Sequence, residues 1–99
     1  MEIIQKAQAG SFESSDILVL IEPNHESGRK IEINSSVMYH YGDQIKQLIN
    51  ETLDHYSIND IHLIINDKGA IVSTISARLE TAILRASKNQ KGTVNQLDN

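Results

Sequence analysis

The sequence predicts an α+β fold, an open-faced sandwich in which two helices cover one face of a small sheet. Three observations support this fold class: a continuous apolar run at 17–21, apolar–polar alternation at 29–34, and two longer segments with an apolar residue every three or four positions. The first two patterns are typical of strands, and the third is typical of helices packed on a core. We expect the element order β-β-α-β-α.

The first strand is expected over about 12–22, where five consecutive aliphatic residues indicate a strand at the centre of its sheet. Pro23 ends this strand, and the second strand, 29–34, is expected to return beside it as a hairpin. The residues before the first strand, 1–9, are weakly patterned, and we expect a loose arm there.

The helices are expected at about 37–56 and 71–87, each with a single apolar stripe. Ser35 or Ser36 is placed to cap the first helix by accepting a bond from a free N–H in its first turn. The stripes are Val37, Tyr41, Ile45, Leu48, Ile49, Leu53 and Tyr56 in the first helix, and Ile71, Ile75, Leu79, Ala82, Ile83 and Ala86 in the second. In the second helix, Arg78 and Glu80 are expected on the solvated face.

A third strand is expected at 61–66, followed by a tight turn at Asp67-Lys68-Gly69. A right-handed crossover makes this strand parallel to 29–34. With the strand at 12–22 between them, every neighbouring pair is antiparallel, which gives a three-stranded, mainly antiparallel sheet with both helices on one face. We expect a single domain over 1–88 and a polar, disordered tail at 89–99.

Composition excludes several classes of function. The 99 residues include no cysteine, so the chain has no disulfide, thiolate nucleophile or cysteine metal site. The net charge of −4, with nine basic residues scattered among thirteen acids, argues against nucleic-acid binding. The longest apolar run is five residues, far too short to span a membrane, and no signal peptide is recognisable. We therefore expect a cytoplasmic protein.

The segment Gly10-Ser11-Phe12-Glu13-Ser14-Ser15-Asp16 joins exposed hydroxyls and acids directly to the most apolar strand. As a catalytic nucleophile, Ser14 would need an activating base, and none of the four histidines lies in a triad or short metal-binding spacing. From composition alone, a polar turn is the favoured interpretation. A third interpretation makes Ser14 an attachment site, for which exposure on a surface loop suffices.

Several separated motifs resemble the acyl carrier protein (gamma) subunit of citrate lyase over about residues 3–88. In order they are Ala9-Gly10-Ser11-Phe12-Glu13-Ser14-Ser15-Asp16, Ile33-Asn34-Ser35-Ser36-Val37, Tyr41-Gly42-Asp43, Asp67-Lys68-Gly69-Ala70 and Ala77-Arg78-Leu79-Glu80. The first is the most specific, because in the family its Gly-x-x-Glu-Ser-x-Asp pattern carries the modified serine. Position 15 is often glycine in this family, whereas here Ser15 places a second hydroxyl beside the first.

The resemblance implies that Ser14 is joined by a phosphodiester to 2'-(5''-phosphoribosyl)-3'-dephospho-CoA, whose terminal thiol is absent from this cysteine-free chain. It implies a non-catalytic carrier of acetyl and citryl thioesters in the cleavage of citrate to oxaloacetate and acetate. The implied partners are the alpha (acyl transferase) and beta (citryl lyase) subunits, with a prosthetic-group transferase and an acetate ligase acting transiently. No metal site, nucleic acid or membrane is implied.

Two alternatives remain open from the sequence. The carrier subunit of malonate decarboxylase bears the same prosthetic group and is the nearest rival of the same class. From a different class, a small α+β module would bind a partner or effector non-covalently, with Ser14 as an ordinary loop residue.

Overall fold

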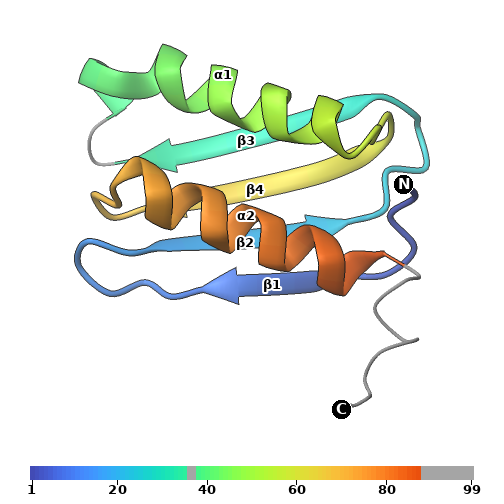
Figure 1. The fold of residues 1–99 in the computed structure, drawn as a ribbon, viewed down its shortest axis with the longest axis horizontal. Helices are drawn as coiled ribbons and strands as arrows, with labels where there is room; N and C mark the ends of the chain where they lie inside the picture. The colour runs from blue at the N-terminus through green and yellow to red at the C-terminus, as the bar shows by residue number, and fades with distance from the viewer. Residues whose placement is uncertain (36–37, 88–99) are drawn as a thin grey trace.

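A computed structural model describes residues 1–35 and 38–87 of the chain, in which two helices pack on one face of a four-stranded sheet (Figure 1). The α+β class and the two helices on one face are confirmed. The expected tail at 89–99 and the possible cap Ser36 lie outside the described residues. The strands are β1 (Ala7–Gly10), β2 (Ile17–Glu22), β3 (Arg29–Ser35) and β4 (Ile61–Asp67), and the helices are α1 (Met38–His55) and α2 (Val72–Ala86).

The sheet order, β1-β2-β4-β3, differs from the expected three-stranded arrangement. β2 and β4 pair antiparallel, and β3 and β4 pair parallel across the α1 crossover. The expected hairpin between 12–22 and 29–34 is therefore wrong, because β4 lies between these strands. The parallel relation of β3 and β4 was expected from crossover handedness, but the sequence pattern did not indicate that they are direct neighbours.

The N-terminal segment is a strand rather than the expected loose arm. Residues 7–10 pair antiparallel with β2, from Ala7 opposite Ile21 to Gly10 opposite Leu18. Alanine and glycine, which make up three of the four residues of β1, are depleted in strands, so this strand has no local signature. It forms because it pairs with β2 and because α2 covers Ala9, which is 4% exposed. As a result β2 begins at Ile17, and residues 11–16 form the loop of a hairpin.

The core lies between the helices and one face of the sheet. Most of the expected helix stripes are buried there, including Ile49, Leu53, Leu79 and Ile83, each with 0% of its surface exposed. Ile71 is an exception, because it precedes the first turn of α2 and is 68% exposed. Within residues 1–35 and 38–87, neither helix is long and apolar enough to cross a membrane.

Gly10 sets the geometry at the end of β1. Its φ is +92°, and a Cβ atom at this position would lie 1.8 Å from the Ile17 carbonyl oxygen. The same carbonyl accepts a hydrogen bond from the Ser11 N–H at 3.2 Å, which closes the two strands at the base of the loop. Only glycine combines this backbone conformation with such a close approach.

We predict that Gly10→Ala lowers the free energy of unfolding by at least about 2 kcal/mol, because both the backbone conformation and the contact with Ile17 become unfavourable. Gly28→Ala is a matched control, since Gly28 has a φ of +89° but no neighbouring group within 4 Å of the position that a Cβ would occupy. The control should lose only about 1 kcal/mol. Urea unfolding of both variants measures the difference, and equal losses would contradict the steric argument.

Candidate functional site

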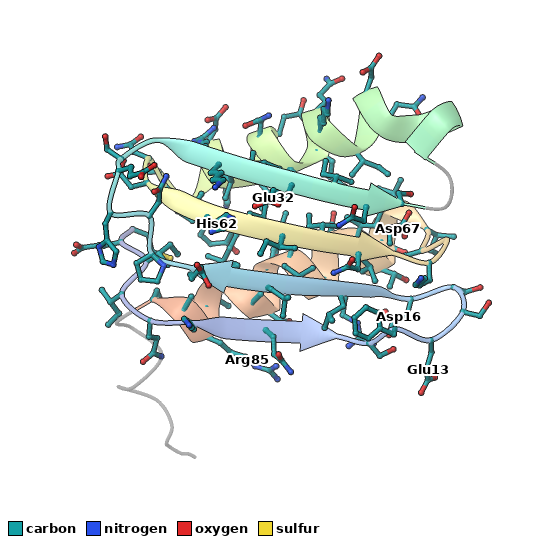
Figure 2. The ribbon with its side chains drawn as sticks, turned by 180° about the vertical axis from the view of Figure 1, so that it is seen from behind. Glu13, Asp16, Glu32, His62, Asp67 and Arg85 are labelled. Carbon is teal, nitrogen blue, oxygen red and sulfur yellow. The ribbon has the colours of Figure 1, made fainter. Side chains whose placement is uncertain are left out.

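The loop at residues 11–16 lies at one end of the molecule, where it connects β1 to β2 (Figure 2 labels Glu13 and Asp16 there). The Asp16 N–H donates to the Glu13 carbonyl oxygen at 3.1 Å, which makes residues 13–16 a β-turn. Ser14 and Ser15 occupy its two central positions. Ser15 has a φ of 66°, a conformation that favours glycine at this position.

The Asp16 carboxylate holds the loop together through four hydrogen bonds. Oδ1 accepts from the Ile17 N–H at 2.7 Å and from Arg78 Nε at 3.2 Å. Oδ2 accepts from Ser11 Oγ at 2.7 Å and from Arg78 Nη2 at 3.1 Å. Ser11 Oγ in turn accepts from the Glu13 N–H at 3.2 Å. This network, which we call the Asp16 clamp, joins both ends of the loop to α2.

The clamp stabilises the ionised form of Asp16. The Ser11 hydroxyl, the Ile17 N–H and the Arg78 guanidinium, in that order of effect, lower the Asp16 pKa from 3.8 to about 2. Asp16 is therefore fully ionised at neutral pH, and its bidentate pair with Arg78 is charge-assisted.

A second set of bonds attaches the loop to the turn after β4. The Ser15 N–H donates to the Lys68 carbonyl oxygen at 2.8 Å, and the Lys68 N–H donates to the Asp16 carbonyl oxygen at 2.9 Å. Asp67, 1% exposed, orders this turn because its Oδ1 accepts from the Gly69 and Ala70 N–H groups and its Oδ2 accepts from Ser35 Oγ. The expected tight turn at Asp67-Lys68-Gly69 is confirmed. It supports the loop at residues 11–16, which we call the serine loop.

Ser14 differs from its neighbours within this fixed loop. It is exposed, and within residues 1–35 and 38–87 neither its hydroxyl nor its backbone takes part in a hydrogen bond. The hydroxyls of Ser14 and Ser15 are both without a hydrogen bond among the described residues, and Ser14 differs from Ser15 in that its backbone is also unbonded. The Ser15 hydroxyl is also exposed, but the Ser15 backbone is anchored to the turn after β4.

None of the histidines whose side chains the structure describes forms a hydrogen bond with Ser14. His62 lies on the helix-free face of the sheet, where Nδ1 is 3.2 Å from Glu22 Oε1 and Nε2 is 2.6 Å from Glu32 Oε2 (Figure 2). Its hydrogen bond lowers the pKa of Glu32. His25 and His55 are exposed in other segments. Among the described residues there is also no group of three or more His, Asp or Glu side chains that could hold a metal.

Glu13, Ser14 and Asp16 lie in one β-turn, and the structure adds a partner of Asp16 that was not predicted from the sequence. Arg78, expected on a solvated helix face, binds Asp16 across 62 positions of the chain. No local pattern signals this contact, since it depends on α2 lying beside the β1–β2 hairpin.

The comparisons with known proteins agree with these observations. The family described as the malonate decarboxylase delta subunit (MdcD), a family of acyl carrier proteins, matches residues 4–86. The citrate lyase acyl carrier protein of Yersinia enterocolitica is 45% identical over 88% of this chain and 90% of its own length. That of Pectobacterium carotovorum is 43% identical over 92% and 94%, respectively. The chain belongs to the citrate lyase acyl carrier protein family. It is thus a non-catalytic carrier.

A solved structure confirms the fold. A chain in the crystal structure of a Pseudomonas malonate decarboxylase hetero-tetramer in complex with malonate superposes with a TM-score of 0.73. The match covers 86% of this chain and 87% of that chain at 22% identity. The fold found here is therefore similar to that of a chain within a hetero-tetrameric assembly.

Membership of an acyl carrier family implies a covalently attached prosthetic group, and the loop fits such a group. Attachment needs an oxygen that is accessible and not already hydrogen-bonded, and the Ser14 hydroxyl meets both conditions. Attachment also needs a site at which a bulky substituent displaces no packed side chain. Ser14 meets this condition because it is an exposed central residue of a surface turn.

The depressed pKa of Asp16 predicts a dependence of stability on pH. Because the folded-state pKa is about 2 and the ordinary value is 3.8, the unfolded chain takes up this proton at higher pH than the folded chain. The stabilisation by Asp16 is therefore present above about pH 4 and is lost as the pH falls toward about 2.

We predict that Asp16→Asn is less stable than wild type at neutral pH and that the difference between them shrinks between about pH 4 and pH 2. Urea midpoints measured across this range test the prediction. Glu26→Gln, which removes an exposed carboxylate outside the clamp, is the control. The difference in urea midpoint between Glu26→Gln and wild type should not shrink over this pH range. A constant difference between wild type and Asp16→Asn would contradict the assignment.

Proposed function

We propose that this chain is the acyl carrier subunit of a citrate lyase and that Ser14 carries its prosthetic group, 2'-(5''-phosphoribosyl)-3'-dephospho-CoA. The group would carry acetyl and citryl thioesters while citrate is cleaved to oxaloacetate and acetate. The partners would be an alpha acyl transferase and a beta citryl lyase subunit, with a prosthetic-group transferase and an acetate ligase acting transiently in the cytoplasm. Residues 1–88 would form the single carrier domain.

The observation that carries the proposal is that Ser14, unlike the other two serines of its loop, has no hydrogen bond through either its hydroxyl or its backbone among the described residues. Ser11 is bonded through its hydroxyl and its N–H, and Ser15 is bonded through its N–H although its hydroxyl is also exposed. A carrier needs this combination, because the hydroxyl must enter another enzyme's active site while its surroundings keep one shape. Ser14 also occupies the serine position of the family's Gly-x-x-Glu-Ser-x-Asp pattern.

Attachment would be a phosphoryl transfer. The Ser14 oxygen attacks the phosphorus of a donor whose phosphate is activated as a phosphoanhydride. The new serine O–P bond forms as the anhydride P–O bond breaks, so that the distal phosphate portion leaves and the phosphodiester remains on Ser14. The serine proton passes to a base of the attaching enzyme, since no described side chain of this chain hydrogen-bonds to the Ser14 hydroxyl.

The attached group supplies the terminal thiol on which acyl groups are carried. The chain's own contribution is position, because a tethered thiol meets successive active sites at a high effective concentration. The Asp16 clamp and the bonds to Lys68 would fix the base of the arm, so that the flexibility lies in the arm.

Citrate lyase is favoured over malonate decarboxylase by the degree of similarity. Relatives described as citrate lyase acyl carrier proteins, including one from Clostridium perfringens at 41% identity, span about nine-tenths of the chain. The malonate decarboxylase chain is 22% identical, which supports the fold alone.

We predict that the chain, isolated from cells that are cleaving citrate, carries an added mass equal to phosphoribosyl-dephospho-CoA on the peptide containing Ser14. Ser14→Ala should abolish this addition and all citrate cleavage by the reconstituted complex. Ser15→Gly is the matched control, because it removes the second hydroxyl and suits the positive φ at that position. It should be modified like wild type. Intact and peptide mass spectrometry provides the measurement.

Two results would refute this proposal. If the added mass were found on Ser15 and Ser15→Gly stayed unmodified, the attachment site would be Ser15 and not Ser14. An unmodified wild-type chain with a fully active Ser14→Ala variant would instead indicate a module that binds its partner non-covalently.

A further inference from the structure

An apolar surface lies at the end of the molecule that carries Ser14. Ile71 and Val72, at the start of α2, expose 68% and 65% of their surface, and Phe12, in the serine loop, exposes 64%. The other large exposed hydrophobic side chains of the described residues expose no more than 42%. We call the two consecutive residues Ile71 and Val72 the apolar end surface, and Phe12 lies in the loop that carries Ser14.

The apolar end surface continues into a groove of about 490 Å³ between α1 and the start of α2. Ile71 and Val72 belong to its lining, so the exposed side chains and the groove form one surface. The remaining lining residues are mostly apolar: Gln44, Ile45, Leu48, Asp67, Gly69, Ala70 and Ile75.

This surface is close to Ser14. The loop between β1 and β2 and the connection from β4 to α2 lie at the same end of the molecule (Figure 1). The Ser15 N–H bonds to the Lys68 carbonyl oxygen at 2.8 Å. Ile71 follows three residues after Lys68, a span of at most about 10 Å. Ile71 therefore lies close to the loop that carries Ser14, where a protein that encloses Ser14 can contact it.

The position of Ile71 also costs stability. It is the N-cap residue of α2, and it makes no side-chain capping bond. Serine, threonine, aspartate and asparagine are strongly preferred at this position because their side chains accept a bond from the first helical turn. An exposed isoleucine here thus gains neither burial nor a cap within the folded chain, so its side chain is available for contact with another molecule.

We infer that the apolar end surface and its groove are the docking site for the enzyme that attaches the prosthetic group to Ser14. This inference rests on the proposed function. Attachment requires the Ser14 oxygen itself to reach the donor phosphorus, so the attaching enzyme must contact the residues around Ser14. The lyase subunits need only the thiol at the end of a long arm, and their contacts can lie elsewhere. The attaching enzyme would present an apolar protrusion that enters the groove.

The test measures the rate at which purified transferase, supplied with its phosphoanhydride-activated dephospho-CoA donor, modifies the apo chain. The variants are Ile71→Ser, Val72→Ser and their combination, and intact mass spectrometry follows the product. We expect each single variant to lower kcat/KM for the chain by roughly tenfold, as removal of a central apolar contact does. Leu84→Ser, on the same helix and 42% exposed, is the matched control and should be modified at the wild-type rate.

A second measurement separates docking from chemistry and from folding. The Ser14→Ala chain, which cannot be modified, should inhibit modification of wild type by competition. The double variant Ser14→Ala/Ile71→Ser should inhibit it more weakly. Ile71→Ser places a favoured N-cap residue on α2, so its urea midpoint should equal or exceed that of wild type. Slow modification could then not be attributed to unfolding.

Several outcomes would overturn the inference. Modification of the double variant at the wild-type rate would contradict the inference. If the double variant were modified normally but failed to bind the lyase subunits, the surface would be assigned to those subunits. If wild type formed a dimer that Ile71→Ser did not form, the surface would be assigned to a second copy of this chain. If attachment of the prosthetic group changed the chemical shifts of the methyl groups in the groove, the groove would be assigned to the attached arm. An unmodified wild-type chain would instead refute the proposed function itself.

Discussion

The rest of the site depends on the hydrogen bonds that the Asp16 carboxylate accepts. This carboxylate joins residues distant in sequence, since Ser11 and Ile17 lie at the two ends of the loop and Arg78 lies on α2. A short loop with three serines and two acids would otherwise sample many conformations, because polar side chains gain as much from water as from one another. A single charged acceptor with four donors converts this loop into a fixed support from which Ser14 projects.

The fold places this support through two constraints on the backbone. Gly10 permits the close approach of β1 to the Ile17 carbonyl, and the buried Asp67 orders the turn to which Ser15 and Asp16 are bonded. Both lie at the end of the sheet where β1 and β4 finish. The residues that hold the loop in place therefore also stabilise the fold at this end of the molecule. Ile71 is an exception, because its exposed side chain contributes little to folding.

The sequence predicted elements whose signals are local and missed those that depend on tertiary pairing. The helices, the strands predicted at 29–34 and 61–66 and the turn predicted at 67–69 follow from periodicity and glycine placement. β1 was missed because Ala7–Gly10 has low strand propensity and is held by β2 and α2. The strand order was wrong for a related reason: apolar β2 does lie inside the sheet, but its outer neighbour is this unpredicted strand. At the candidate site, the contact between Asp16 and Arg78 was not predicted.

The central claim is that the Asp16 clamp holds the serine loop in one conformation. Amide hydrogen exchange of wild type and Asp16→Ala, with Ile65 in β4 as an internal reference, tests it most directly. We predict that protection of the Ser15 and Asp16 amides falls by about tenfold or more relative to that of Ile65 in the variant. Equal relative protection of these loop amides in the two proteins would show that the loop is ordered without the clamp and would contradict this account.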